Sequence, residues 1–167
     1  DDHHILIDMT TSTPTLAEKI YALGKEKGIA TLDAPVSGGD KGAQNGTLTT
    51  MVGGDEETFD AAKDVLSVFF FFLMLQGPAG SGQQTKMANQ IMVAGTMTGM
   101  TELLVYSKAA GLDLERVIEQ VGSGSAANWS LTNYGPRILK EDYTAGFFIK
   151  HFVKDLKIAL DEAEKMG

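Results

Sequence analysis

The segment Gly77-Pro-Ala-Gly-Ser-Gly-Gln-Gln-Thr-Lys-Met-Ala-Asn-Gln90 divides the chain into two parts with different sequence patterns. Before it, short apolar runs alternate with helical patterns, which is typical of an α/β layer with a substantially parallel sheet. After it, strand patterns stop, and helices joined by short Gly or Asn turns follow. The sequence therefore predicts an α/β region over 1–78 and an all-α region over 79–167.

The first region carries clear start and stop signals. Pro14 precedes a helical pattern that ends before Gly28, and Asp55 is placed to cap the next helix at its N-terminus. The last strand follows its helix with no Gly, Asn or Pro between them, which indicates either an unusually tight turn or missing residues. We expect strands over 5–9, 30–36, 48–52 and 68–75, and helices over 15–27 and 56–66.

The second region is expected to begin with one long helix. Ser81 and Gln84 form the Ser-x-x-Gln pattern of a capping box, and no proline interrupts the chain before Gly111. Apolar residues lie on nearly every side of this helix, which is typical of a helix inside a bundle or between two domains. Shorter helices are expected over 113–121, 128–134 and 153–166.

Composition argues against several classes of protein. The chain has 167 residues, a formal net charge of -8 and no cysteine. An acidic balance argues against a sequence-independent grip on nucleic acid, which needs clustered Lys and Arg. No apolar run reaches the roughly 20 residues of a membrane span, and no spacing of His, Asp or Glu indicates a metal site. Without disulfides, a cytoplasmic location is the simplest expectation.

Three groups of residues are candidates for chemistry. Ser37-Gly38-Gly39 follows a predicted strand, and its backbone N–H groups can form an anion-binding loop, although a lone Ser-Gly-Gly is more often an ordinary turn. Lys154-Asp155 opens the last helix, either as ordinary exposed charges or, with Lys150, beside an anionic cofactor.

Lys86 is the third candidate, in the second turn of the long helix. The positive end of the helix dipole there would lower its pKa towards a range useful for proton transfer. Asn89 and Gln90 follow three and four residues later and can share its face. An exposed surface lysine is the ordinary alternative, but apolar neighbours and the open Gly-Ser-Gly approach favour a site.

Four motifs follow one another along the chain: Ile7-Asp-Met-Thr-Thr-Ser-Thr-Pro14, Asp33-Ala-Pro-Val-Ser-Gly-Gly39, Gly80-x-Gly-x-x-x-Lys86-x-x-Asn89 and Lys154-Asp-Leu156. In this order they resemble the β-hydroxyacid dehydrogenases, a family that includes 3-hydroxyisobutyrate dehydrogenase, tartronate semialdehyde (2-hydroxy-3-oxopropionate) reductase and, more distantly, 6-phosphogluconate dehydrogenase. The resemblance implies the C-terminal part of a Rossmann-type, parallel-sheet cofactor domain over 1–78, followed by an all-α domain over 79–167 that begins with an inter-domain helix. It further implies NAD or NADP as cofactor, and interconversion of a small β-hydroxy acid and its semialdehyde or oxo acid.

The same resemblance assigns roles to the matching residues. Lys86 is implied as the general acid/base, with Asn89 as the catalytic amide beside it. The implied substrate-binding residues are Ser37, Gly38, Gly39, Gln90, Phe147 and Asp155, and the implied cofactor-binding residues are Thr11 and Lys154. Many family members have asparagine where this chain has Gln90, and Asn-Gln resembles the tartronate semialdehyde reductase branch.

The family's Gly-x-Gly-x-x-Gly loop, which seats the cofactor pyrophosphate at a helix N-terminus, does not occur in these 167 residues. We therefore expect a fragment that lacks this N-terminal loop and the C-terminal end of the family. The residue that selects NAD or NADP belongs to the same absent part.

Two other functions compete with the dehydrogenase. One is a non-catalytic dinucleotide-binding or assembly module on the same fold, which the absent loop motivates. The other is an imine reductase, although those enzymes usually replace the lysine that is retained here as Lys86. The expected partners are a small carboxylate substrate and further copies of the chain, in a dimer or tetramer, without nucleic acid or membrane.

Overall fold

The computed structural model describes residues 4–167, and their contacts divide them into two compact units. The first unit contains the residues up to Asn89 together with Gly146–Gly167, and the second contains Gln90–Ala145. The last helix therefore belongs with the N-terminal half of the chain. The structure confirms the α/β class, with a Rossmann-type region followed by helices.

The predicted elements occur in the predicted order, and one helix, α2 (Gly39–Asn45), was not predicted. The elements are β1 (Ile5–Asp8), α1 (Pro14–Glu26), β2 (Ala30–Asp33), β3 (Val36–Ser37), α2 (Gly39–Asn45), β4 (Leu48–Gly54), α3 (Glu56–Leu66), β5 (Phe70–Gly77), α4 (Ser81–Ala109), α5 (Leu114–Gly122), α6 (Trp129–Leu139) and α7 (Ile149–Met166). The predicted strand over 30–36 is divided into β2 and β3, and α7 begins four residues earlier than the expected 153.

The sheet of the first unit is mixed rather than substantially parallel. β1 pairs with β2, and β4 pairs with β5, in parallel, but β2 and β3 both pair with β4 in the antiparallel sense. Parallel neighbours need a crossover of a dozen or more residues. Only the short helix α2 separates β3 from β4, so the chain returns in the opposite direction.

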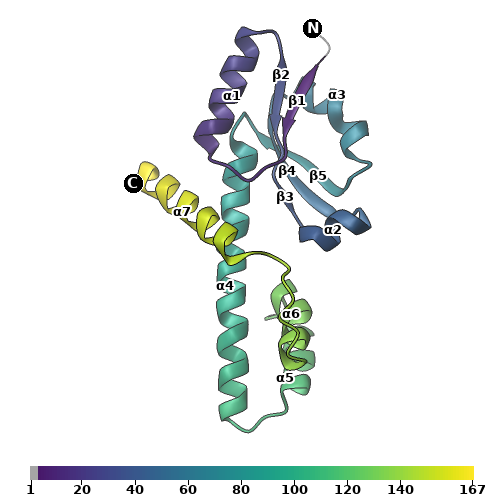
Figure 1. Ribbon diagram of the computed structural model, residues 1–167, viewed down its shortest axis with the longest axis vertical. Helices are drawn as coiled ribbons and strands as arrows, with labels where there is room; N and C mark the ends of the chain where they lie inside the picture. Colours follow the sequence, from purple (N-terminus) through teal and green to yellow (C-terminus); the bar gives the residue numbers. More distant parts are fainter. Residues whose placement is uncertain (1–3) are drawn as a thin grey trace. The chain divides into compact units, whose positions relative to one another are not determined.

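Helices cover the sheet on both sides, with α1 and α3 drawn on opposite sides in Figure 1. The apolar core lies between the sheet and α3, and it includes Leu32, Val52, Phe59, Leu66 and Phe70. Between α3 and β5 the chain reverses within three residues, because Ser67 and Phe69 donate their main-chain N–H groups back to the last turn of the helix. The connection in this chain is thus a tight turn made by residues 67–69.

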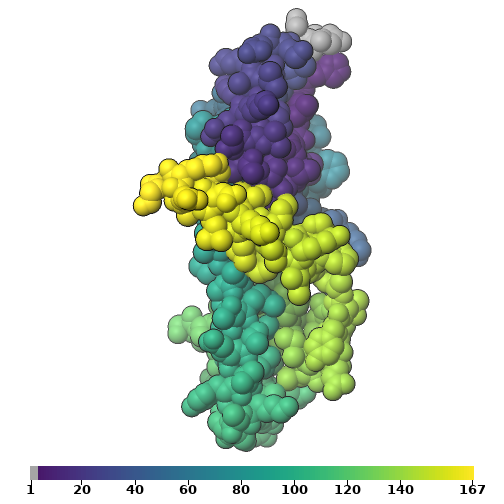
Figure 2. Space-filling view, turned by 60° about the vertical axis from the view of Figure 1, so that its left-hand side comes forward, coloured from purple at the N-terminus to yellow at the C-terminus, as the bar shows by residue number. Residues whose placement is uncertain are grey.

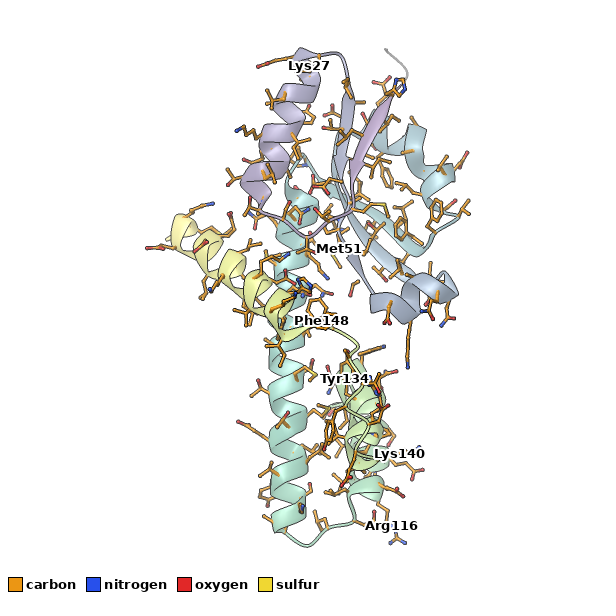
Figure 3. The ribbon with its side chains drawn as sticks, viewed as in Figure 1. Lys27, Met51, Arg116, Tyr134, Lys140 and Phe148 are labelled. Atoms are coloured by element: carbon orange, nitrogen blue, oxygen red, sulfur yellow. The ribbon has the colours of Figure 1, made fainter. Side chains whose placement is uncertain are left out.

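The start of α4 is held by a carboxylate from the sheet instead of by the predicted capping box. Asp33 Oδ1 accepts from Gly80 N at 2.8 Å, and Asp33 Oδ2 accepts from Gln83 N at 2.9 Å. An ideal Cβ at Gly82 would lie only 2.4 Å from Met51 O on β4, the residue labelled in Figure 3. A glycine is needed there so that the helix can approach the sheet this closely.

The predicted position of Asp55 is confirmed, but its side-chain contact is different. Asp55 occupies the N-cap position of α3, but its side chain makes no capping hydrogen bond. Its carboxylate accepts instead from the Tyr21 hydroxyl at 2.9 Å, which ties α1 to the start of α3. A partner from another helix thus replaces the local cap.

The second unit has its own apolar core, formed by Met100, Leu104, Ile118 and Leu131. Asn128 caps α6 through its side-chain oxygen, which accepts from Leu131 N at 2.9 Å. The rings of Trp129 and Tyr134 meet edge to face, with centroids 5.1 Å apart, and Tyr134 is labelled in Figure 3. Across residues 4–167, no helix combines the length and the apolar character that crossing a membrane requires.

Candidate active site

Two loops and one helix start meet at the same edge of the sheet in the first unit. β1 and β2 are parallel, so the segments that follow them, 9–13 and 34–35, begin at the same edge of the sheet. Asp33, the last residue of β2, holds the start of α4 at this edge. In α/β sheets this carboxyl edge is where ligands bind.

Lys86 is buried at this edge, with 7% of its surface exposed. Its Nζ donates a hydrogen bond to Val36 O at 2.8 Å, directly before Ser37. Burial, which disfavours the charged ammonium, is the main reason that the pKa of Lys86 is lowered; the negative charge of Asp155 raises it, and the positive charge of Lys154 lowers it. The predicted direction is confirmed, but its main cause is burial.

The Ser37-Gly38-Gly39 loop joins β3 to α2 and needs its glycines. Gly38 has φ of 129° and Gly39 has φ of 64°, a backbone region that residues with a Cβ rarely adopt. An ideal Cβ at Gly39 would lie 3.9 Å from Gly146 O, so the loop lies beside the segment that leads into α7. The next residue in that segment is Phe147.

Lys154 reaches the loop after β1 from α7, with Asp155 beside it on the same helix. Lys154 Nζ donates to Thr11 O at 2.6 Å and pairs with Asp155 Oδ1 at 3.0 Å. Asp155 is 2% exposed, while the Lys154 side chain is half exposed. Figure 2 shows α7 crossing beside the N-terminal part of the chain, and Lys165 Nζ also donates to Thr15 Oγ1 there, at 3.1 Å.

The remaining predicted site residues lie on α4 and directly before α7. Asn89 is half-buried and Gln90 is buried on α4, one turn after Lys86. Phe147 is partly exposed, and its ring centroid lies 6.1 Å from that of Phe152. Phe148, labelled in Figure 3, occupies the N-cap position of α7.

Sequence reasoning assigned no role to Asp33 or Gln83, although both lie inside the quoted motifs. Gln83 is fully buried and binds the loop after β1 through its side chain. The available signal was weak: a polar side chain between Gly82 and Lys86, in the first turn of a helix that begins among glycines. Within the described residues, no three His, Asp or Glu side chains gather as a set of metal ligands.

Comparison with known proteins defines the family. Residues 1–69 match the model for the NAD-binding domain of 6-phosphogluconate dehydrogenase. Residues 80–167 match the model for the NAD-binding region of NADP-dependent 3-hydroxyisobutyrate dehydrogenase. The chain belongs to the β-hydroxyacid dehydrogenase family. NAD or NADP is the cofactor of this family.

Individual members of the family match nearly all of this chain. An uncharacterized oxidoreductase of Bacillus subtilis, YkwC, is 53% identical over 97% of this chain and 56% of its own length. The 2-hydroxy-3-oxopropionate reductase of Escherichia coli is 37% identical over 97% of this chain and 56% of its own length. The chain therefore spans about half the length of the curated relatives it matches.

A solved structure agrees with these sequence matches. The Mycobacterium tuberculosis 3-hydroxyisobutyrate dehydrogenase with L-serine superimposes with a TM-score of 0.88 at 32% identity. The alignment covers 98% of this chain and 58% of that one. The Rossmann-type region followed by helices is therefore the fold of this family in the part of the chain described above.

Proposed function

We propose that the full-length protein is an NAD(P)-dependent oxidoreductase that interconverts a small β-hydroxy acid and its semialdehyde or oxo acid, with Lys86 as general acid/base. The observation that carries the proposal is the buried Lys86, whose ammonium is hydrogen-bonded to Val36 O beside the Ser37-Gly38-Gly39 loop. Burial lowers the pKa of Lys86, which increases the fraction of neutral amine available for proton transfer.

The residues at this edge fit the nicotinamide end of a dinucleotide. The loop that carries Thr11 leaves the carboxyl end of β1, and Lys154 Nζ fixes its backbone from α7. We assign Thr11 and Lys154 to cofactor binding. A nicotinamide held there would supply the hydride-transfer chemistry of the reaction in both directions.

The chain's own residues handle the carboxylate and the proton. Gly38 and Gly39, whose φ angles are positive, would present backbone N–H groups to the substrate carboxylate, with Ser37 directly before them at the end of β3. Neutral Lys86 takes the hydroxyl proton during oxidation, and the ammonium returns it to the carbonyl oxygen during reduction. Asn89, with Gln90 as the alternative, would hold the reacting oxygen, while Phe147 and Asp155 would border the substrate.

Two relatives indicate which substrates to test. One relative is a 2-hydroxy-3-oxopropionate reductase, and one solved relative holds L-serine. D-glycerate, L-serine and 3-hydroxyisobutyrate share a carboxylate and a β-hydroxyl group, so all three belong in the assay. We further propose that the protein works as a homo-oligomer in the cytoplasm.

The test is an NAD(P)-dependent assay of the full-length protein and of its Lys86→Met variant. We expect turnover of at least one of the three acids, and a fall in kcat of about 10²–10⁴-fold in the variant. Lys108→Met is the matched control, because Lys108 is an exposed lysine on the same helix. Unchanged kcat in Lys86→Met would refute its role. NADH or NADPH binding without any turnover would favour the non-catalytic module.

A further inference from the structure

Gln83 is a fully buried amide that the mechanism above does not use. A buried polar side chain is costly unless it is hydrogen-bonded. Its Oε1 accepts from Ser12 N at 3.1 Å, and its Nε2 donates to Thr10 O at 2.8 Å. Both partners are backbone groups of the loop that follows β1.

The two hydrogen bonds lie on either side of Thr11 and have opposite polarity. One needs an acceptor for Ser12 N and the other needs a donor for Thr10 O, and a neutral carboxamide supplies both. An ionised carboxylate has no donor, and an apolar side chain of equal length has neither group. The residue type at position 83 is thus matched to this loop.

Other contacts restrain the same loop and the same helix. Lys154 Nζ binds Thr11 O, and Asp8 Oδ1 accepts from Thr10 N at 2.9 Å. On the helix side, the main-chain N–H of Gln83 is held by Asp33. Lys86 is three residues further along α4, nearly one helical turn away. Lys86 and Gln83 lie on the same helix. The Gln83 side chain therefore links this helix by hydrogen bonds to both neighbours of Thr11.

We propose that Gln83 is a positioning residue: its amide fixes Thr11, and with it the nicotinamide end of the cofactor, in a set position relative to Lys86. This inference rests on the function proposed above, which gives Thr11 and Lys86 their roles. A displacement of about 1 Å between reacting groups can reduce a rate by about 100-fold. Losing this amide would therefore affect catalysis without removing any group that reacts.

The first test measures the loop directly, without turnover. Hydrogen–deuterium exchange of a peptide covering residues 10–13 should become at least about 10-fold faster in Gln83→Met than in the wild type, because the Ser12 amide loses its acceptor. Gln84→Met is the matched control: Gln84 lies next on the same helix, and its amide contacts Glu162 on α7 instead. Unchanged exchange in Gln83→Met would overturn the proposal.

The second test measures catalysis in the full-length protein. In Gln83→Met we expect kcat per folded active site to fall about 10–100-fold, while the pH at which Lys86 titrates in the rate profile stays in place. Gln83→Glu keeps the length and the acceptor but loses the donor, so it should also lose kcat, and it serves if the Met variant does not fold. A purely structural role would lower the melting temperature and leave kcat per folded site unchanged, which would overturn the proposal.

The two tests separate this proposal from the function on which it rests. Faster exchange at 10–13 with no turnover by the wild type would support the anchoring role of Gln83 and refute the dehydrogenase. Turnover that depends on Lys86 but is unaffected by Gln83→Met and Gln83→Glu would leave the dehydrogenase standing and refute the positioning role.

Discussion

Buried side chains are mostly polar in the first turns of α4 and mostly apolar in its later turns. At its start the helix buries Gln83, which binds the loop after β1, and Lys86, which binds the backbone of β3; the buried Asp33 holds the helix itself. In the second unit, its later turns contribute Met100 and Leu104 to an apolar core. Burying polar groups is costly unless each finds a partner. Hydrogen bonds to distant backbone groups therefore fix the position of the first part of α4, and apolar packing holds the later part.

The largest effect should come from Asp33→Ala. Both buried N–H groups, of Gly80 and Gln83, would lose their acceptor, at a cost of about 1–3 kcal/mol each and about 2–6 kcal/mol in total. Urea denaturation of the full-length protein measures this loss. Asp40→Ala, an exposed carboxylate at the start of α2, is the control and should change stability by less than about 0.5 kcal/mol. A loss below about 1 kcal/mol in Asp33→Ala would mean that other acceptors reach these groups.

A somewhat smaller effect is expected in the apolar part. Leu131 is 1% exposed and packs in the core with Met100 and Leu104, so Leu131→Ala should destabilise the protein by about 2–5 kcal/mol. The pH profile of the remaining activity should not move, because no charge near Lys86 changes. Leu112, which is 51% exposed in the same unit, provides the control variant Leu112→Ala. A shifted pH profile in Leu131→Ala would show that the contrast between the two parts of α4 is too simple.

The contrast also explains what could be predicted from the sequence. The apolar pattern and the absence of proline predicted α4 almost to the residue, because local propensity and packing determine that feature. The capping of α4 was predicted wrongly, because its acceptor, Asp33, lies some fifty residues earlier in the chain. The N-cap position of Asp55 was predicted correctly, but its carboxylate binds Tyr21 on another helix, which the local pattern could not show. Periodicity reports neighbours along the chain and not such distant partners.

The candidate site divides in the same way. Motif order identified Lys86, Thr11 and Lys154, and the structure brings these three into one unit. Their roles remain predictions. Periodicity gave no sign that Gln83 binds Thr10 and Ser12, because such a hydrogen bond depends on how the sheet brings β1 next to α4.

The smallest expected effect is a shift of the pH–rate profile, and its direction should be opposite for the two charged residues that act on Lys86. The negative charge of Asp155 raises the pKa of Lys86, and the positive charge of Lys154 lowers it. Asp155→Asn should therefore lower this pKa and move the rising limb of the pH–rate profile for oxidation to lower pH, since the neutral amine is the active form. Lys154→Met should move the same limb to higher pH.

Two features make this pair of variants informative. Lys154 also binds Thr11 O, so kcat of the Lys154→Met variant is expected to fall as well. The effect of the charge is therefore measured by the pH at which the rate rises, and not by the maximal rate. Asp161→Asn, an exposed carboxylate on α7, should leave the limb in place. If both Asp155→Asn and Lys154→Met moved the limb in the same direction, the pKa of Lys86 would not be controlled by these charges. Burial would then act alone, and the polar start of α4 would serve to hold the lysine without tuning it.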